Sequence, residues 1–434
     1  MPAEEFRRMQ ARFPRCVWLD GGGARGWSGR RSLLGWLEQD DVSLTYNAAR
    51  REVTRHAGGR GVVVGEDPFV VLAAEVAAGR PSDQWFGYFG YAARSDLPAR
   101  PDPDLPDAVW MRPSHIREYQ EGLVRHSLHL SGVATPDKRR NRRSTGDSDT
   151  PPPTYVQAFE RVQEHLHAGD SYEVNLTHRL RVASDLDPAT AYLRLRELNP
   201  APYAGFVQHD VEGAPAWLLS SSPERYALIT ADRFIETRPI KGTTARGRTP
   251  TEDAAARERL ATDAKYRSEN LMVVDLLRND LAMVCDVGSV VVPTLMEVES
   301  YASVHQLVST VRGRLRPEVT TLDALRALFP AGSMTGAPKL RTMEIIDEVE
   351  VAPRGAYSGA FGWIGGDGRA DLGVIIRSLL TAGPTAGPTA GPTADSGYLL
   401  GTGGGITVDS EVSAEWAETE WKITQLRRAL SPQA

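Results

Sequence analysis

Cysteine is scarce in this chain, with two residues, Cys16 and Cys285, among 434. They lie far apart in the sequence, and neither has a second cysteine at the short spacing of a zinc or redox motif. A disulfide framework and a cysteine metal site are therefore excluded. So few cysteines are typical of proteins in a reducing compartment, and we expect this one in the cytoplasm.

Long apolar runs are also missing. No stretch approaches the roughly 18 consecutive apolar residues of a membrane-spanning helix. The first residues, MPAEEFRRMQARFPR, are charged and have no apolar core, so they do not resemble a secretory signal. The net charge of −6 at pH 7 gives no general attraction to nucleic acid or to an acidic membrane. We therefore expect a protein that binds neither.

The composition that is present, 41% hydrophobic and 24% charged, is that of an ordinary globular protein. Predicted strands and scattered helices lack the regular rhythm of a parallel sheet, which favours an α+β fold with largely antiparallel sheets. Residues 135–153 combine a basic cluster with consecutive prolines, and they predict a disordered linker between an N-terminal region, 1–134, and a second region, 154–434. Tandem Thr-Ala-Gly-Pro repeats predict a flexible insertion at 381–396.

One lysine stands at an unusual place. Residues Arg233–Thr237 alternate as a strand does, and Pro239 ends that strand because it has no N–H to donate. Lys241 follows, next to Gly242, which frees the backbone. An amine held where strand becomes loop can lose hydration and have its pKa lowered, as a nucleophile requires. The alternative is a lysine whose head stays in water.

Acidic side chains suggest a metal site. Glu415 and Glu418 are three residues apart on the last predicted helix, with Lys422 one turn further on the same face. Glu269 lies near the start of another predicted helix. Carboxylates that converge from two helices suit Mg²⁺. The alternative is a Glu–Lys pair on the surface of a single helix.

A run of glycines, Gly403, Gly404 and Gly405, joins a predicted strand to the last predicted helix. Bare backbone N–H groups at such a place can bind a carboxylate or a phosphate. Glycine-rich turns without a ligand are common, so this run alone decides nothing.

Several stretches, taken together and in this order, resemble the chorismate-utilising enzymes. They are Gly169–Leu176, Ser222–Tyr226, Pro239–Thr243, Glu269–Asp280, Val304–Leu307, Gly332–Lys339 and the segment from Gly403 to the last helix. The resemblance covers residues 154–430, and more loosely the first 134 through Trp27–Arg30 and Trp85–Tyr91. It implies a fold of two large, mostly antiparallel sheets packed as a sandwich with helices outside.

The family has branches that differ at a few positions. The lysine within Pro239–Thr243 is similar to that of the aminodeoxychorismate synthases, component I, whereas anthranilate synthases usually have alanine there. Water-using members have a lysine base where this chain has Glu173, and a carboxylate cannot copy that role. Anthranilate synthase component I stays the alternative within the family. A silent module that binds chorismate or an amino acid is the alternative of another class.

The resemblance implies a role for each candidate residue. Lys241 would add to C2 of chorismate, and Glu224 would be the general acid for the departing C4 hydroxyl, with a raised pKa. Mg²⁺ would be held by Glu269 and Glu418, with Glu415 as a further ligand or a neighbour of the ligands. The substrate would be oriented by Thr243, His305, Tyr357, Arg377, Gly403, Gly404, Gly405 and Lys422.

The resemblance also implies a partner. Neither Cys16 nor Cys285 lies in the glycine-rich turn that carries the cysteine nucleophile of glutamine amidotransferases. We therefore expect ammonia to come from a separate glutamine amidotransferase subunit.

Overall fold

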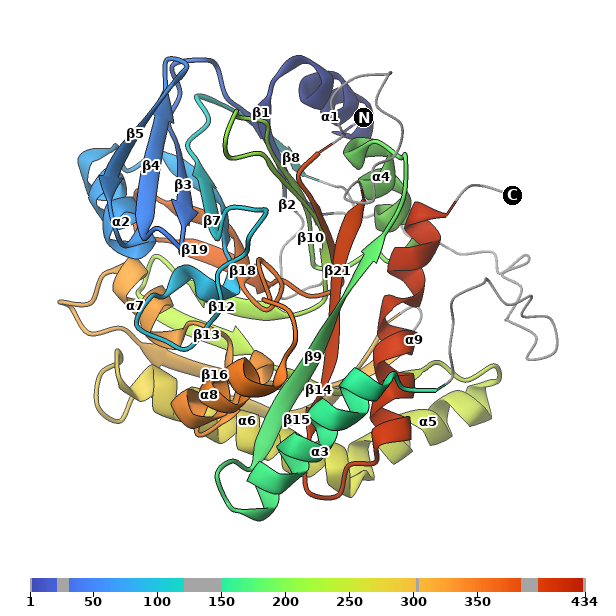
Figure 1. Ribbon diagram of the computed structural model, residues 1–434. Coiled ribbons are helices and arrows are strands. Elements are labelled where there is room, and N and C mark those ends of the chain that lie inside the picture. Colours follow the sequence, from blue (N-terminus) through green and yellow to red (C-terminus); the bar gives the residue numbers. More distant parts are fainter. Residues whose placement is uncertain (1, 22–30, 121–149, 302–303, 384–396, 432–434) are drawn as a thin grey trace.

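The computed structural model describes residues 2–21, 31–120, 150–301, 304–383 and 397–431. In these residues the chain forms two large sheets, and all strand pairings in them are antiparallel (Figure 1). Most of the predicted linker at 135–153, most of the insertion at 381–396, and Trp27–Arg30 lie outside the described residues.

Strands from both halves of the chain enter both sheets. The first sheet has the order β17 (Gly336–Ala337), β9 (Glu173–Val182), β21 (Tyr398–Ile406), β20 (Ser378–Thr381), β11 (Ala216–Ser222), β10 (Tyr203–His209), β1 (Arg15–Asp20), β2 (Arg31–Trp36), β8 (His115–Gln120). The second has the order β14 (Ile240–Ala245), β16 (Val304–Arg314), β13 (Phe234–Arg238), β12 (Arg225–Ile229), β19 (Ala370–Val374), β18 (Ala360–Gly365), β6 (Gln84–Phe89), β7 (Ala108–Met111), β3 (Ser43–Asn47), β4 (Glu52–Ala57), β5 (Arg60–Gly65), with β15 (Val291–Ser300) also paired to β16.

The two sheets pack face to face. Val17 and Leu218 of the first sheet share one buried cluster with Phe86, Tyr88 and Phe361 of the second. Because alternate residues of a strand point to opposite faces, each sheet also needs a cover on its outer face. The predicted sandwich is confirmed.

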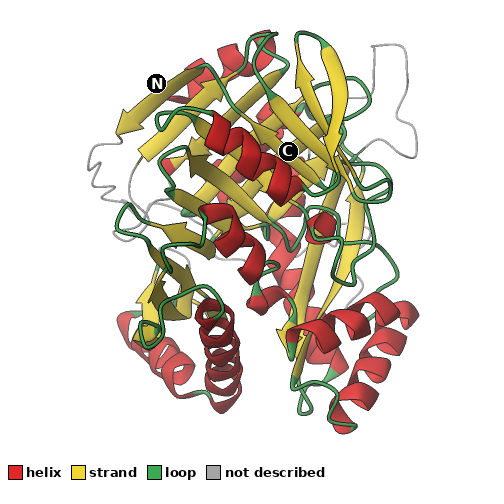
Figure 2. Cartoon of the chain, turned by 90° about the vertical axis from the view of Figure 1, so that its left-hand side faces the viewer, coloured by secondary structure: helices red, strands yellow, loops and turns green. Residues whose placement is uncertain are grey.

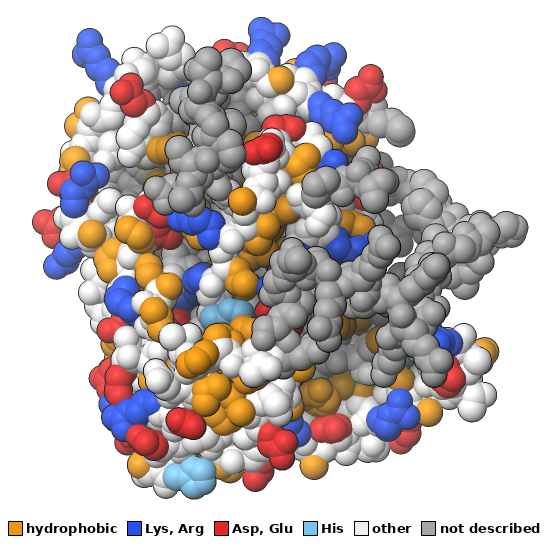
Figure 3. All heavy atoms as spheres, turned by 45° about the vertical axis from the view of Figure 1, so that its right-hand side comes forward, with side chains coloured by type: hydrophobic (Ala, Val, Ile, Leu, Met, Phe, Trp, Pro, Cys, Tyr) orange, Lys and Arg blue, Asp and Glu red, His pale blue; other side chains and the backbone are white. Residues whose placement is uncertain are grey.

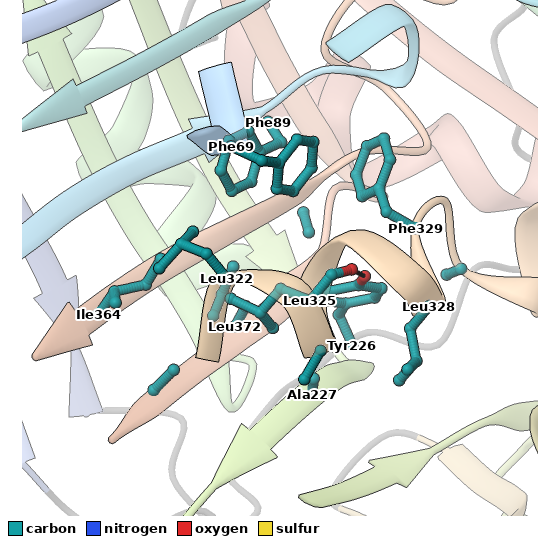
Figure 4. Packing of buried hydrophobic residues seen from close by; sticks show 14 of the residues in the cluster. Phe69, Phe89, Tyr226, Ala227, Leu322, Leu325, Leu328, Phe329, Ile364 and Leu372 are labelled. Atoms are coloured by element: carbon teal, nitrogen blue, oxygen red, sulfur yellow. Dashed lines mark hydrogen bonds between the residues drawn. The ribbon is translucent and has the colours of Figure 1, made fainter. Parts of the chain in front are cut away.

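Helices supply that cover, as Figure 2 shows from the side. The first sheet is covered by α1, α4 and α9, and the second by α2, α6 and α7. In Figure 4, leucines of α7 point at the second sheet, and the rings of Phe69 and Phe89 stack at 4.0 Å beside Phe329. The helices are α1 (Pro2–Arg12), α2 (Pro68–Ala78), α3 (Pro153–His167), α4 (Pro188–Leu198), α5 (Pro250–Thr262), α6 (Ala264–Ala282), α7 (Thr321–Leu328), α8 (Lys339–Val349) and α9 (Val412–Leu430).

One face of the molecule is mixed in charge. On the face seen in Figure 3, basic and acidic side chains are interspersed among apolar ones. No helix within the described ranges combines the length and the apolar character needed to cross a membrane.

The lysine predicted at a strand end lies within a strand. After Pro239 the chain resumes pairing with the same neighbour, because Ile240 of β14 lies opposite Val308 of β16. The register then shifts before Thr243, which marks a β-bulge, and Gly242 within it has a φ of +89°. Pro239 therefore interrupts the sheet for one residue and does not end it. The bulge turns Lys241 toward the first sheet.

Candidate active site

A cavity of about 360 Å³ separates β14 of the second sheet from β9 and β21 of the first, and α6 and α9 close its sides. Eleven of the thirteen predicted site residues line it: Glu224, Lys241, Thr243, Glu269, Tyr357, Arg377, Gly403, Gly404, Gly405, Glu418 and Lys422. His305 and Glu415 are not among the lining residues. The tertiary structure thus gathers residues from distant parts of the chain around one space.

A larger hollow, about 1010 Å³, lies beside β3, β4 and β5. Two of its buried polar side chains, Arg15 and His56, already have partners in the protein. Arg15 donates to the Asp41 carbonyl at 2.7 Å, and His56 Nε2 contacts Thr45 Oγ1 at 2.8 Å. The cavity at Lys241, whose polar groups converge on open space, is the better candidate for chemistry.

Lys241 is a buried amine with a carboxylate in contact. It is 8% exposed, and its Nζ donates to Glu173 Oε1. Burial alone lowers the pKa of this amine, but the carboxylates around it, Glu173 above all, raise it above its ordinary value. The expectation of a lowered pKa is wrong for this arrangement. Burial does desolvate the amine, but the negative charge of Glu173 and its neighbours raises the pKa by more than desolvation lowers it.

Glu224 lies across the cavity as a buried carboxyl group. Burial raises its pKa to about 7, against the opposing effects of the Ser333 hydrogen bond and of the nearby Lys241 charge. Ser333 Oγ donates to Glu224 Oε1 at 2.6 Å and so orients the carboxyl group. The pKa is raised as the sequence led us to expect. A carboxyl group with this pKa is partly protonated at neutral pH and can give up a proton.

Arg377 and Tyr357 form one wall. The Arg377 guanidinium makes no hydrogen bond to any residue within the described ranges, and burial lowers its pKa to about 10. It lies 5.3 Å from the ring centre of Trp421, and the Arg179 guanidinium lies 4.4 Å from the ring centre of Tyr357. An unpaired fork of N–H groups facing a cavity suits a ligand carboxylate.

The three glycines form the last part of β21, not a turn after it. Gly403 lies opposite Thr177 and Gly405 opposite Asn175 in the ladder with β9. The carbonyl of Gly403 accepts from Lys422 Nζ at 2.8 Å, so this peptide edge faces α9. A Cβ on Gly405 would lie 2.1 Å from Glu173 Oε1, so the glycine leaves the space that the buried ion pair fills.

The predicted metal ligands are close to one another but do not converge. No three acidic, histidine or cysteine side chains within the described ranges are grouped tightly enough to hold a metal ion. Lys265 Nζ lies between two of the predicted ligands, 2.6 Å from Glu415 Oε1 and 3.9 Å from Glu269 Oε1. Lys422 pairs with Glu418 at 2.7 Å.

The donor set nevertheless fits Mg²⁺ in its chemistry. It consists of carboxylates on two helices, which are the ligands that a hard cation takes. Glu269 Oε1 is buried without a hydrogen-bond partner within the described ranges, so it can accept a ligand bond.

His305 faces away from the cavity. Its Nε2 contacts Asp253 Oδ1 at 3.0 Å and its Nδ1 contacts Ser300 Oγ at 2.8 Å, while the next residue, Gln306, lines the cavity. Successive residues of β16 point to opposite faces of the sheet. His305, which was predicted to orient the substrate, is therefore not among the residues that line this cavity.

A family model for chorismate-binding enzymes matches residues 36–428. The chain belongs to the chorismate-binding enzyme family. Aminodeoxychorismate synthase of Streptomyces pristinaespiralis is 48% identical over 281 residues, which are 64% of this chain and 37% of that relative. Aminodeoxychorismate synthase component 1 of Escherichia coli K12 is 43% identical over 277 residues, which are 64% of this chain and 57% of that relative.

The matched part therefore spans less than two thirds of the length of either curated relative. Among solved structures, anthranilate synthase component I from Streptococcus pneumoniae has a TM-score of 0.70 at 25% identity, covering 92% of each chain. This likeness extends over both sheets and agrees with the sandwich described above.

Two residues that contact the predicted catalytic groups of this chorismate-binding enzyme were not indicated as site residues by the sequence. Glu173 contacts Lys241, and Ser333 contacts Glu224. Both lie in stretches that carry the family resemblance, so their positions were visible. Their contacts were not, because each depends on two segments about 70 to 110 residues apart that only the fold brings together.

Proposed function

We propose that this chain converts chorismate and ammonia into 4-amino-4-deoxychorismate. The observation that carries the proposal is that Lys241 and Glu224 line the same cavity. A buried amine can add to the ring, and a carboxyl group with a pKa of about 7 can protonate the group that leaves. The names of the curated relatives support the same reaction.

The amine has to lose a proton before it adds. Glu173 Oε1 is the acceptor in contact with it. The free amine of Lys241 then forms a bond to C2 of chorismate, the double bonds of the ring shift, and the C4 hydroxyl departs. Glu224 gives that hydroxyl a proton, so the leaving group is water.

Ammonia completes the exchange. It adds at C4, the double bonds shift back, and the bond between C2 and Lys241 breaks. The departing lysine takes its proton back from Glu173, and the proton that the new amine gives up returns Glu224 to its acid form. The covalent step divides one difficult displacement into two easier ones.

The remaining lining residues hold the substrate. Arg377 offers a fork of N–H groups to the enolpyruvyl carboxylate, with Tyr357 beside it. Lys422 and the peptide edge from Gly403 to Gly405 face the rest of the ring substituents, and Thr243 lines the ring.

The carboxylates of Glu269 and Glu418, with Glu415 next to them, would hold Mg²⁺ against the ring carboxylate. When bound, the metal draws negative charge out of the conjugated ring as the nucleophile adds.

A partner protein would supply the ammonia. Cys16 and Cys285 are both buried, and burial raises the pKa of the Cys285 thiol to about 11. A thiol of this kind is a poor nucleophile at neutral pH. We therefore propose a separate glutamine amidotransferase subunit, in keeping with the component 1 named among the relatives.

Mass spectrometry of the product made from chorismate, Mg²⁺ and an ammonium salt tests the proposal. The expected product is 4-amino-4-deoxychorismate. Anthranilate with pyruvate would identify an anthranilate synthase instead, the activity named for the similar solved structure. Binding of chorismate without turnover, with or without a glutaminase, would identify a silent binding module.

A further inference from the structure

Lys265 occupies an unusual position at the start of α6. Its side chain is 40% exposed, yet its Nζ reaches two carboxylates that are almost completely buried, Glu415 at 2.6 Å and Glu269 at 3.9 Å. Glu269 is on the same helix one turn on, whereas Glu415 is on α9. One amine that enters from the solvent side therefore neutralises carboxylates of two helices.

Buried carboxylates require a positive charge nearby, since an unpaired buried charge is costly. Glu418 obtains it from Lys422, which is also bound to the Gly403 carbonyl. Glu415 obtains it from Lys265, and Glu269 obtains it from Lys241 and from Lys265. Glu269 Oε1 is still without a hydrogen-bond partner within the described ranges, because 3.9 Å is too long for one. The contact is therefore an incomplete substitute for a cation that binds both carboxylates directly.

Lys265 is one of four cations, with Lys241, Lys422 and Arg377, that lie in or beside the cavity near the carboxyl groups of Glu173, Glu269, Glu415 and Glu418. A dicarboxylate substrate adds two negative charges, and Mg²⁺ adds two positive ones. If Mg²⁺ takes the place between Glu269 and Glu415, the amine of Lys265 is repelled. Its exposed stem allows it to leave, which the buried stem of Lys241 does not.

We propose that Lys265 is a built-in competitor of Mg²⁺. It holds the two carboxylates until the metal arrives, and it then swings into solvent. The proposal rests on the proposed function, which places Mg²⁺ at these residues. Binding of Mg²⁺ to the protein alone is weak, because the metal must displace a cation. Binding is stronger with a dicarboxylate substrate, whose negative charge favours a doubly charged ion over an amine.

Calorimetric titration of the full chain with Mg²⁺, without chorismate, tests this. The Lys265→Met variant is expected to bind Mg²⁺ about tenfold more tightly than the original protein, the gain that follows if the amine blocks the site about nine tenths of the time. Lys265→Arg keeps the charge and is expected to bind Mg²⁺ no more tightly than the original protein. Lys265→Gln serves as a second neutral variant.

Thermal unfolding gives a readout that does not depend on catalysis. Without Mg²⁺, Lys265→Met is expected to melt at a lower temperature than the original protein, because Glu415 loses its positively charged partner and keeps only the hydrogen bond from Ser410. Saturating Mg²⁺ is expected to raise the melting temperature of this variant more than that of the original protein. Lys339→Met is the matched control. It breaks the 2.6 Å pair of Lys339 on α8 with Asp280 on α6, the helix that also carries Lys265. Mg²⁺ is expected to restore none of the stability lost in this variant.

An unchanged or weaker Mg²⁺ affinity in both neutral variants would overturn the proposal. That failure is distinct from failure of the proposed function. If the original protein makes 4-amino-4-deoxychorismate with Mg²⁺ while the neutral variants bind the metal no more tightly, only the competition is wrong. If it makes another product, the reaction is wrong, and the comparison of Mg²⁺ affinities still decides the role of Lys265.

Discussion

Lys241 combines two conditions that are seldom found together. It is desolvated enough to react, but it is kept as an ammonium ion by the carboxylate of Glu173. Such a pair holds the amine in one position and leaves it inactive until its proton moves. The residue is therefore expected to matter for the chemical step more than for substrate binding.

Lys241→Ala is expected to lower the rate of amino product formation by about 100-fold or more, the range in which loss of one catalytic group falls. Binding of chorismate and of Mg²⁺ is expected to stay largely intact, because Arg377 and the acidic residues remain. Steady-state kinetics and equilibrium binding of the same sample measure both. Unchanged turnover would rule out the covalent route.

Glu224→Gln tests the general acid. The acid form of Glu224 exists below its pKa of about 7 and is lost as pH rises through it. For the original protein we expect kcat/KM to fall about tenfold per pH unit above that pKa. The variant is expected to lose about 10²- to 10⁴-fold in kcat and to lack this descending limb. A limb that persists unchanged in the variant would assign it to another group.

The sequence indicated the identity of most site residues but not their surroundings. The pattern around Lys241 suggested desolvation, and it contained nothing about Glu173, which approaches from 68 residues away. His305 is a second example. Its motif predicted a role in orienting the substrate, but the pleat of β16 turns Gln306 into the cavity instead.

At the level of elements, β9 and β21 form the floor of the cavity. Their register sets Gly405 against Asn175, and it brings Gly405 so close to Glu173 that only a residue without Cβ fits. The neighbouring Gly404 is less crowded, since its Cβ would lie 3.3 Å from Glu415 Oε2. The two glycines thus have different tolerance for a methyl group.

Gly405→Ala is expected to displace the Glu173–Lys241 pair and to lower kcat about tenfold or more, while Gly404→Ala is expected to retain most of the activity. Circular dichroism of both variants shows whether the fold is kept. Equal losses of kcat in the two variants would contradict the inference that Gly405 is more crowded than Gly404.

A buried ion pair fastens α8 to β9. Arg354 donates to Glu350 at 2.7 Å and to the carbonyls of Met334 and Asn175, and Glu350 in turn accepts from the Thr177 backbone at 2.8 Å. This contact holds the strand that carries Glu173 in place.

Arg354→Met is expected to lower the free energy of unfolding by about 3–5 kcal/mol, because it leaves Glu350 buried without its partner. Urea denaturation measures the change. Arg341→Met on the preceding helix, α8, removes partly exposed pairs with Glu344 and Asp170 and is expected to cost less than about 1 kcal/mol. A similar loss of unfolding free energy in both variants would show that burial does not determine how much an ion pair stabilises the fold.

For the whole molecule, the distant parts of the chain are interleaved. Strand β1 pairs with β2 and with β10, and β6 pairs with β7 and with β18, so the N-terminal region contributes to both sheets. The cavity lies between these sheets. Its ammonia is expected to come from outside the chain, because both thiols are buried.

The purified chain is expected to form product with an ammonium salt and none above background with glutamine. Addition of a glutamine amidotransferase subunit is expected to make glutamine a competent donor. Product analysis by mass spectrometry compares the donors. Turnover with glutamine by the chain alone would contradict the separate source of ammonia.

The sequence by itself determined the class of fold and the residue types available for chemistry, because these depend on local periodicity and on motifs read along the chain. The apolar face of α3, for example, follows from spacing alone. Only the tertiary structure decided that Lys241 is paired with Glu173, that Lys265 lies between the predicted metal ligands, and that His305 faces away. Charge, burial and direction at these positions depend on neighbours that lie far off in the sequence, and local patterns carry no record of them.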